Sequence, residues 1–262
     1  MRKSARTALV LSGGCLRGYA QIGVLKALGA AGVRPDLVVG SSVGAVIGAL
    51  LAAGRTVRDI EHAGEALPVS RLKRWAWSRH GLWTTAGLEA WLRDLMPVHR
   101  IEHFPVRFAA VATDTASGRI VVLQAGDACR AVCASSAMPG FFVPVVVQGR
   151  SCADACLVSP LPVRTARELG AQTVIAVDTL LDPHAARAGG LVDRVLQPWR
   201  VMARALAAGE ARDADVLIRP DLSGCHDRRS LIDAGESAAI AALRAMRFAE
   251  PAGEDGQLAS AA

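Results

Sequence analysis

Two strand-turn-helix units follow one another near the start of the chain. Residues 7–12 form a short apolar and β-branched run that ends at a glycine pair, and residues 18–31 then repeat apolar positions at helical spacing. Residues 37–39 are again a short apolar run, followed by a glycine-flanked turn at 40–44 and by an apolar helix over 45–53. Because strands that are joined through a helix pair in parallel, the pattern predicts a βαβ unit.

The centre of the chain is less regular up to Pro105, and strand patterns return after it. Residues 107–112 and 119–123 are two such patterns on either side of a polar turn that contains glycine, which predicts an antiparallel hairpin. A helix is predicted over 128–136, followed by two strand patterns that flank residues 148–150. This part of the chain therefore contributes antiparallel pairing.

The last third of the chain alternates helix and strand patterns and shows neither an internal repeat nor a linker between two domains. We therefore expect a single α/β domain over residues 1–250, and a disordered tail over the small and polar residues 251–262. The elements predicted in this third are a helix over 163–169, a strand over 173–177, a loop over 182–190, a helix over 191–211, a strand over 216–218 and a helix over 236–248.

Composition and charge narrow the class of protein only a little. Of the 262 residues, 52% are hydrophobic, which is enough for one sizeable core. The 30 Lys and Arg against 24 Asp and Glu would suit a phospholipid headgroup or a nucleic acid, without choosing between them. The apolar run at 8–11 is too short for a signal peptide, and the run at 44–54 is too short to span a bilayer. We expect a cytoplasmic protein, soluble or peripheral on the inner membrane face.

The six cysteines give no sign of a metal site. They form no CxxC pair, so no zinc site, other metal or cofactor is expected, and a reducing cytosol is the simplest setting. Cys129 and Cys133 share one face of a predicted helix, at positions i and i+4. Since free Cys behaves as a small hydrophobe, we expect both in the core.

A glycine-flanked serine stands where a strand pattern turns into a helix pattern. Gly40, Ser42 and Gly44 give the spacing G-x-S-x-G in the setting of a nucleophile elbow. So tight a turn needs residues without Cβ on both sides of the serine, whose hydroxyl then projects near the helix N-terminus. An anion that forms there meets free backbone N–H groups. A plain small-residue turn before a closely packed helix fits the same five residues, so the pattern alone leaves both interpretations open.

The first glycine turn offers a second set of backbone donors. Gly13, Gly14, Cys15, Arg17 and Gly18 follow the first predicted strand. N–H groups in such a loop can cradle a phosphate or line an oxyanion hole, because both tasks turn several donors toward an anion. Nucleotide binding is the weaker interpretation, since Cys15 breaks the spacing G-x-G-x-x-G and no lysine follows Gly18.

Several further motifs stand in a fixed order along the same part of the chain. They are the glycine loop with Arg17 and Gly18, the segment 22–28, the elbow at 40–44, the segment 112–114, the segment 134–140, and Asp154 before Pro160. With these motifs the chain resembles the patatin-like phospholipases, and more narrowly the small bacterial members related to the esterase domain of neuropathy target esterase. The resemblance covers about residues 8–178 and implies a three-layer α/β/α patatin-like fold with a mostly parallel central sheet.

The resemblance also implies a Ser-Asp dyad without histidine, in which Ser42 attacks an ester carbonyl and Asp154 accepts its proton. Backbone N–H groups of the loop 13–15 would bind the oxyanion, and Arg17 would brace that loop or face a lipid phosphate. Because an isolated Asp with a pKa of about 3.9 is a weak base, the dyad requires burial and direct contact. The implied substrate is a phospholipid, a lysophospholipid or a simple acyl ester, and no nucleic-acid partner is expected.

The chain departs from the family at two positions beside this site. Cys15 stands where a third glycine is usual, and Ala155 stands where a glycine usually follows the aspartate. Cys15 keeps its backbone donor, but a positive φ there would cost about 1 kcal/mol and turn the N–H. The methyl group of Ala155 would press on the Asp154 carboxylate. We therefore expect a slower but active enzyme.

Two other functions fit the same residues. An esterase with a Ser-His-Asp triad would use Ser42 with His184 or His226. A non-hydrolytic lipid-binding or regulatory protein would keep the fold with a closed oxyanion hole, and Asp154 would then be an ordinary turn residue. Hydrolysis of a chromogenic ester separates both enzymes from the binding protein, and an indispensable histidine would identify the triad.

The segment 71–83 mixes aromatic and basic side chains. It contains three of the five Trp residues and four Lys or Arg residues, a mixture that suits a bilayer interface. A helix that closes its Trp side chains over the core, with its basic side chains in water, fits the segment equally well. The residues that would contact a membrane are Arg71, Lys73, Arg74, Trp75 and Trp77.

Overall fold

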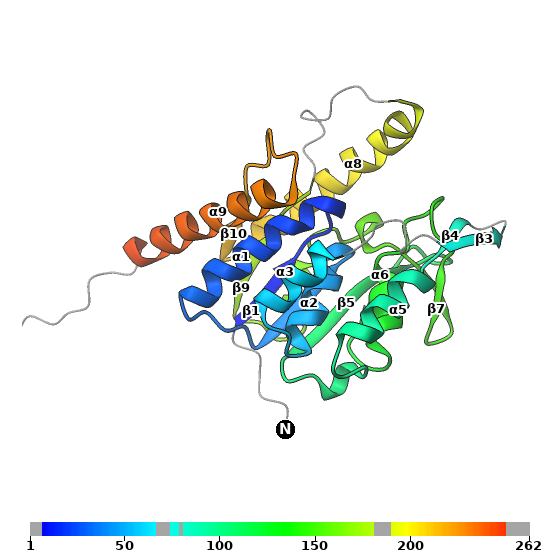
Figure 1. Ribbon diagram of the computed structural model, residues 1–262, viewed down its shortest axis with the longest axis horizontal. Coiled ribbons are helices and arrows are strands. Elements are labelled where there is room, and N and C mark those ends of the chain that lie inside the picture. Colours follow the sequence, from blue (N-terminus) through cyan, green and yellow to red (C-terminus); the bar gives the residue numbers. More distant parts are fainter. Residues whose placement is uncertain (1–6, 67–73, 79–80, 181–189, 250–262) are drawn as a thin grey trace, which may run out of the picture.

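The chain is built around one large sheet (Figure 1). The computed structural model describes residues 7–66, 74–78, 81–180 and 190–249 of the chain. The eight strands of the sheet in this part are β1 (Thr7–Leu11), β2 (Leu37–Ser41), β5 (Arg107–Asp114), β6 (Ile120–Leu123), β7 (Val145–Val147), β8 (Arg150–Ala153), β9 (Thr173–Val177) and β10 (Val216–Ile218). Their order is β10, β9, β1, β2, β5, β8, β7, with β6 also paired to β5. The pairs from β10 to β5 are parallel and those beyond are antiparallel, which confirms the mostly parallel sheet.

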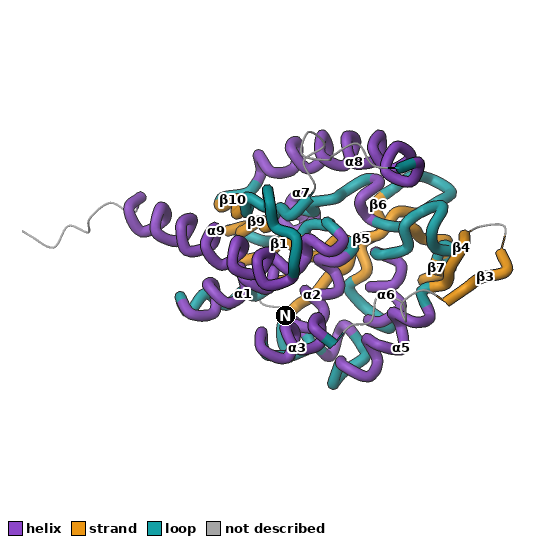
Figure 2. Tube along the Cα trace, turned by 45° about the horizontal axis from the view of Figure 1, so that its top comes forward, coloured by secondary structure: helices purple, strands orange, loops and turns teal. Residues whose placement is uncertain are grey.

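Helices cover both faces of this sheet, so the molecule has three layers (Figure 2). Side chains alternate along β1: Leu9 and Leu11 pack with one set of helices, while Ala8 and Val10 pack on the opposite face. The helices are α1 (Tyr19–Ala30), α2 (Val43–Ala52), α3 (Val57–Glu65), α5 (Ala86–Leu95), α6 (Ala128–Ser135), α7 (Val163–Glu168), α8 (Leu191–Glu210) and α9 (Arg228–Ala249). In Figure 2, α7 and α8 lie on one side of the strands, and α1, α2 and α3 lie on the other.

The first βαβ unit and the central hairpin form as the hydrophobic pattern predicts. β1 and β2 pair in parallel, with Leu9 opposite Val38. β5 and β6 pair in antiparallel fashion, with Val111 opposite Val122. Cys129 and Cys133 have no exposed surface and pack in the core, which confirms their expected burial.

The last helix begins earlier than the pattern predicts. It starts at Arg228 rather than at residue 236, because the Asp227 carboxylate accepts the N–H of Ser230 at 2.8 Å and caps a polar first turn. None of the helices in the described parts of the chain combines the length and the apolar character of a membrane span.

The less regular stretch contains α3, α5 and a hairpin of β3 (Arg74–Ser78) and β4 (Gly81–Thr84). The helix considered for residues 71–83 is therefore wrong. The hairpin forms because β4 also bonds to a segment that is distant in the sequence. The Trp83 N–H donates to the Phe141 carbonyl at 2.9 Å, and the Trp83 carbonyl accepts the N–H of Val143 at 2.9 Å. Arg71, Lys73 and the tail at 251–262 lie outside the described residues, as does all of the predicted loop at 182–190 except Gly190.

Candidate active site

β2 passes into α2 through a tight turn, and Ser42 stands at that turn. Its backbone has φ 53° and ψ −123°, a conformation that costs a non-glycine residue about 1 kcal/mol or more. A Cβ on Gly40 would lie 2.5 Å from the backbone of Ala45, and one on Gly44 would collide with the carbonyl of Leu11. The two glycines thus let strand and helix approach each other, and the Ser42 hydroxyl is held at the N-terminus of α2.

The side chains of Ser42 and Asp154 meet although 112 positions separate them in the chain. Ser42 Oγ donates to Asp154 Oδ2 at 2.8 Å, and the N–H of Cys156 donates to Oδ1 at 2.8 Å. Asp154 is only 1% exposed, and burial raises the pKa of its carboxyl, while the hydrogen bonds from Cys156 and Ser42 partly lower it. A carboxylate with a raised pKa is a stronger base for the serine proton. The site therefore has the burial, the direct contact and the basicity that a Ser-Asp pair requires.

The C-terminal end of α6 and the residues directly after it support both residues through their backbones. Ser135 Oγ accepts the N–H of Ser42 at 2.9 Å, and the carbonyl of Ala137 accepts the N–H of Asp154 at 2.9 Å. From the other side, Thr113 Oγ1 donates to the Asp154 carbonyl at 2.8 Å. Ser135 and Thr113 lie in motifs that resemble the family's, but their partners are 93 and 41 positions away, so the sequence assigned them no role.

Backbone donors beside the elbow come from the glycine loop and from the first position of α2. The N–H of Gly13 is taken, because it donates to the Pro160 carbonyl at 3.0 Å, and this corrects the prediction that the whole loop would bind an oxyanion. The N–H groups of Gly14 and Cys15 have no acceptor among the described residues. The same holds for Val43, which follows the serine and which the sequence analysis missed. These three donors can serve a developing oxyanion.

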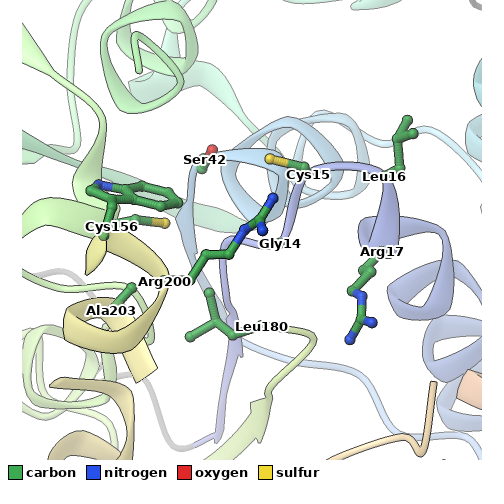
Figure 3. A pocket seen from close by; sticks show the side chains of 10 residues that line it. Gly14, Cys15, Leu16, Arg17, Ser42, Cys156, Leu180, Arg200 and Ala203 are labelled. Atoms are coloured by element: carbon green, nitrogen blue, oxygen red, sulfur yellow. The ribbon is translucent and has the colours of Figure 1, made fainter. Parts of the chain in front are cut away.

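The remaining residues of the glycine loop, Arg17 and Gly18, shape it, and the N–H of Arg17 closes the loop by donating to the Gly14 carbonyl at 3.0 Å. Gly18 passes close to α2, where a Cβ would lie 2.5 Å from the Val43 side chain. Figure 3 shows the Arg17 side chain directed away from Ser42, whereas Arg200 of α8 reaches toward the turn at Gly14. A role for Arg17 in bracing the loop or in meeting a lipid phosphate stays a prediction.

The two departures from the family have different outcomes. Cys15 has φ 51°, so it occupies the left-handed region in which a Cβ costs energy. The expectation for Ala155 is wrong: this residue lies in a short 3₁₀ helix (Ala155–Leu157), it is not among the residues with positive φ, and the contact between Ser42 and Asp154 forms beside it.

Replacing Cys15 by Gly is expected to raise kcat, because a residue without Cβ frees the N–H at position 15 to turn toward the oxyanion. If the whole strain of about 1 kcal/mol at position 15 were removed from the activation free energy, kcat would rise at most roughly fivefold. Steady-state hydrolysis of a chromogenic ester measures it, with Ala155→Gly as the control that leaves kcat unchanged. An equal gain from Ala155→Gly, or no gain from Cys15→Gly, would contradict this expectation.

Two cavities meet at Ser42. One, of about 430 Å³, also touches Asp154 and is lined mainly by apolar and aromatic side chains. The second, of about 220 Å³, lies between the glycine loop and α8 (Figure 3). The aromatic side chains of the first cavity are Tyr19, Trp83, Trp91, Phe141 and Phe142.

Histidines and metal ligands take no part in the described site. His226 is exposed in the segment before α9 and has no hydrogen bond to Ser42 or Asp154 among the described residues. His184 lies outside the described residues. In the same described ranges, no three His, Cys, Asp or Glu side chains gather as metal ligands would.

Comparisons with known proteins agree with the geometry. An uncharacterized NTE family protein of Mycobacterium bovis is 37% identical over 177 residues, which are 66% of this chain and 49% of that protein. Human patatin-like phospholipase domain-containing protein 6 is 33% identical over 187 residues, which are 65% of this chain and 13% of that protein. The chain thus matches about half the length of the first relative and a small part of the second.

The fold is shared with a more distant solved structure. That of VipD from Legionella pneumophila matches with a TM-score of 0.53 and 14% identity, over 93% of this chain and 67% of that one. The family model described as patatin-like phospholipase matches residues 9–167, which include the elbow, the glycine loop and Asp154. The chain therefore belongs to the patatin-like phospholipase family.

Proposed function

We propose that this protein is a serine acyl hydrolase that cleaves carboxylic esters of phospholipids, lysophospholipids or simple acyl esters through Ser42 and Asp154. The observation that carries the proposal is the 2.8 Å contact between these two buried side chains at the mouth of an apolar cavity. The cavity has the apolar character that an acyl chain needs. The N–H groups of Gly14, Cys15 and Val43, which have no acceptor in the part of the chain that the structure describes, supply donors for an oxyanion.

In the first half of the reaction, Ser42 Oγ attacks the ester carbonyl carbon and passes its proton to Asp154 Oδ2. The carbonyl oxygen becomes an oxyanion, which the N–H groups of Gly14, Cys15 and Val43 stabilise. When the tetrahedral intermediate collapses, the ester C–O bond breaks and the leaving alcohol takes the proton from Asp154. The acyl group remains on Ser42 as an ester.

In the second half, water attacks the acyl-serine and gives one proton to Asp154. The second tetrahedral intermediate collapses, the carboxylic acid leaves, and the proton returns to Ser42 Oγ. The N–H of Cys156 holds the carboxylate of Asp154 through Oδ1, so that Oδ2 stays directed at the serine throughout the cycle. The raised pKa of Asp154 favours the two steps in which the carboxylate accepts a proton, first from the serine and then from water.

Labelling with a fluorophosphonate probe tests this proposal, together with hydrolysis of a chromogenic ester by the pure protein. Modification at Ser42, mapped by mass spectrometry, and turnover of the ester are the expected results. No labelling and no hydrolysis would instead favour a lipid-binding or regulatory protein with the same fold.

We expect reversible binding to anionic vesicles through the segment 71–83, because its aromatic and basic residues are interleaved. Co-sedimentation with the vesicles should fall as salt rises, since screening weakens attraction between exposed charges. Changing Trp75 and Trp77 to Ala should reduce it. Equal sedimentation of the wild type and the Trp75 and Trp77 variant would show that these side chains do not contact the bilayer.

A further inference from the structure

The second cavity at Ser42 has a basic side chain in an otherwise largely apolar lining. Arg200 of α8 and Arg17 of the glycine loop both line it, but the Arg17 side chain is directed away from Ser42, so Arg200 brings the positive charge next to the serine (Figure 3). Among the described residues that line this cavity, none is Asp or Glu. A cavity with this charge, next to a serine that faces an apolar cavity on its other side, favours a substrate with an anionic group on the side away from its acyl chain.

Arg200 is placed to hold such a group. Its side chain is only 20% exposed, and one nitrogen, Nη2, pairs with Asp193 at 3.1 Å. A guanidinium has five N–H donors, and the others on Arg200 have no acceptor among the described residues. Asp193 is 47% exposed, so water screens its charge, whereas the guanidinium reaches from α8 toward Gly14 and Cys15 (Figure 3).

The two cavities divide a substrate at its ester bond. With the carbonyl carbon at Ser42 and the acyl chain in the apolar cavity, the alcohol part of the ester extends into the second cavity. In a glycerophospholipid, the alcohol part carries a phosphate a few bonds from the ester. Arginine suits this group, because its planar fork binds phosphate oxygens through two parallel hydrogen bonds.

We propose that Arg200 is a specificity-determining residue that binds the phosphate of an acyl glycerophosphate substrate and places its ester at Ser42. This inference rests on the proposed function, which it narrows. α8 lies beyond the residues 9–167 that the family model matches, so this contact belongs to the part of the chain outside that match.

The first test compares two substrates that differ only in the phosphate, a 1-acylglycerol 3-phosphate and the 1-monoacylglycerol with the same chain. Arg200→Gln should lower the ratio of kcat/KM for the phosphorylated ester to that for the neutral ester by roughly 10- to 100-fold, the range for a hydrogen bond to a charged group. Most of the change should appear in KM. Arg200→Lys, which keeps the charge without the fork, should give a smaller decrease.

Arg194→Gln is the matched control, since Arg194 is an exposed arginine on the same helix and does not line the cavity. Its substrate ratio should equal that of the wild type. An unchanged ratio for Arg200→Gln would overturn the proposal. So would an equal loss on both substrates, which would assign Arg200 to the oxyanion or to folding, and circular dichroism would separate these two outcomes.

A binding measurement tests the phosphate contact without hydrolysis. In the Ser42→Ala protein, calorimetric titration with glycerol 3-phosphate should show binding that weakens at least tenfold on adding Arg200→Gln and stays unchanged on adding Arg194→Gln. Competition by inorganic phosphate shows whether the glycerol contributes. If the wild type hydrolyses no ester, the proposed function fails while this titration still decides the subsite. Absent binding, or equal binding with and without Arg200, would overturn the inference.

Discussion

The rate of ester hydrolysis is expected to fall by at least about 10⁴-fold when Ser42 is changed to Ala, because Ala has no hydroxyl that could attack the ester and carry the acyl group. The strained turn should survive the change, since Ala keeps the Cβ and the backbone N–H that donates to Ser135 Oγ. Activity on a chromogenic ester, fluorophosphonate labelling and the thermal unfolding midpoint measure these effects together. The residual rate should match that of the protein with a blocked serine.

Ser41 provides the control, because it is the neighbouring hydroxyl and points elsewhere. It is buried, with its Oγ 3.6 Å from the sulfur of Cys156. Ser41→Ala should keep most of the activity and lose a little stability. An inactive Ser41→Ala protein together with an active Ser42→Ala protein would show that Ser42 is not the nucleophile.

Changing Asp154 to Asn is expected to lower kcat by on the order of 10³- to 10⁴-fold, because an amide of the same shape cannot accept the serine proton. The folding stability of the protein should not fall in the same way. The raised pKa of Asp154 means that the folded protein binds this proton more tightly than the unfolded chain, so its contribution to stability decreases as pH rises from the ordinary value to the raised one. At neutral pH the Asn variant should therefore unfold at a temperature no lower than the wild type.

Histidine variants separate a dyad from a triad. His226→Ala and His184→Ala should each retain most of the activity, since the base that contacts Ser42 in the structure is a carboxylate. Single-turnover rates of Asp154→Asn, His184→Ala and His226→Ala on the same chromogenic ester test these expectations. An essential histidine, or a fully active Asp154→Asn protein, would move the assignment to a Ser-His-Asp esterase.

The sequence predicted elements where the hydrophobic period was strong or a turn was marked by glycine. The βαβ unit and the β5–β6 hairpin are of this kind. α3 was missed because its helical face is short, although Thr56 and Asp59 cap it reciprocally and this pair was a readable signal. The β3–β4 hairpin had no such local signal, because its position depends on contacts with Phe141 and Phe142, distant in the chain.

At the candidate site, local motifs pointed to Ser42 and Asp154, and the structure brings them together. Their supports follow from tertiary packing and could not be predicted. The occupation of the Gly13 donor by Pro160 and the approach of Arg200 both depend on segments that pack beside the loop only in the folded chain. A motif points to candidate side chains, whereas the neighbours that hold them are set by the sheet order.

The end of α6 and the residues directly after it accept the N–H groups of Ser42 and Asp154, and so join the two proposed catalytic residues into one cooperative unit. Opening the end of α6 with the two residues after it releases the acceptors Ser135 and Ala137 together, so the proposed nucleophile and its proposed base lose their supports in a single local event. The amides at positions 42 and 154 should then exchange with solvent deuterium at closely similar rates. Heat inactivation would begin as a local transition, before the sheet itself unfolds.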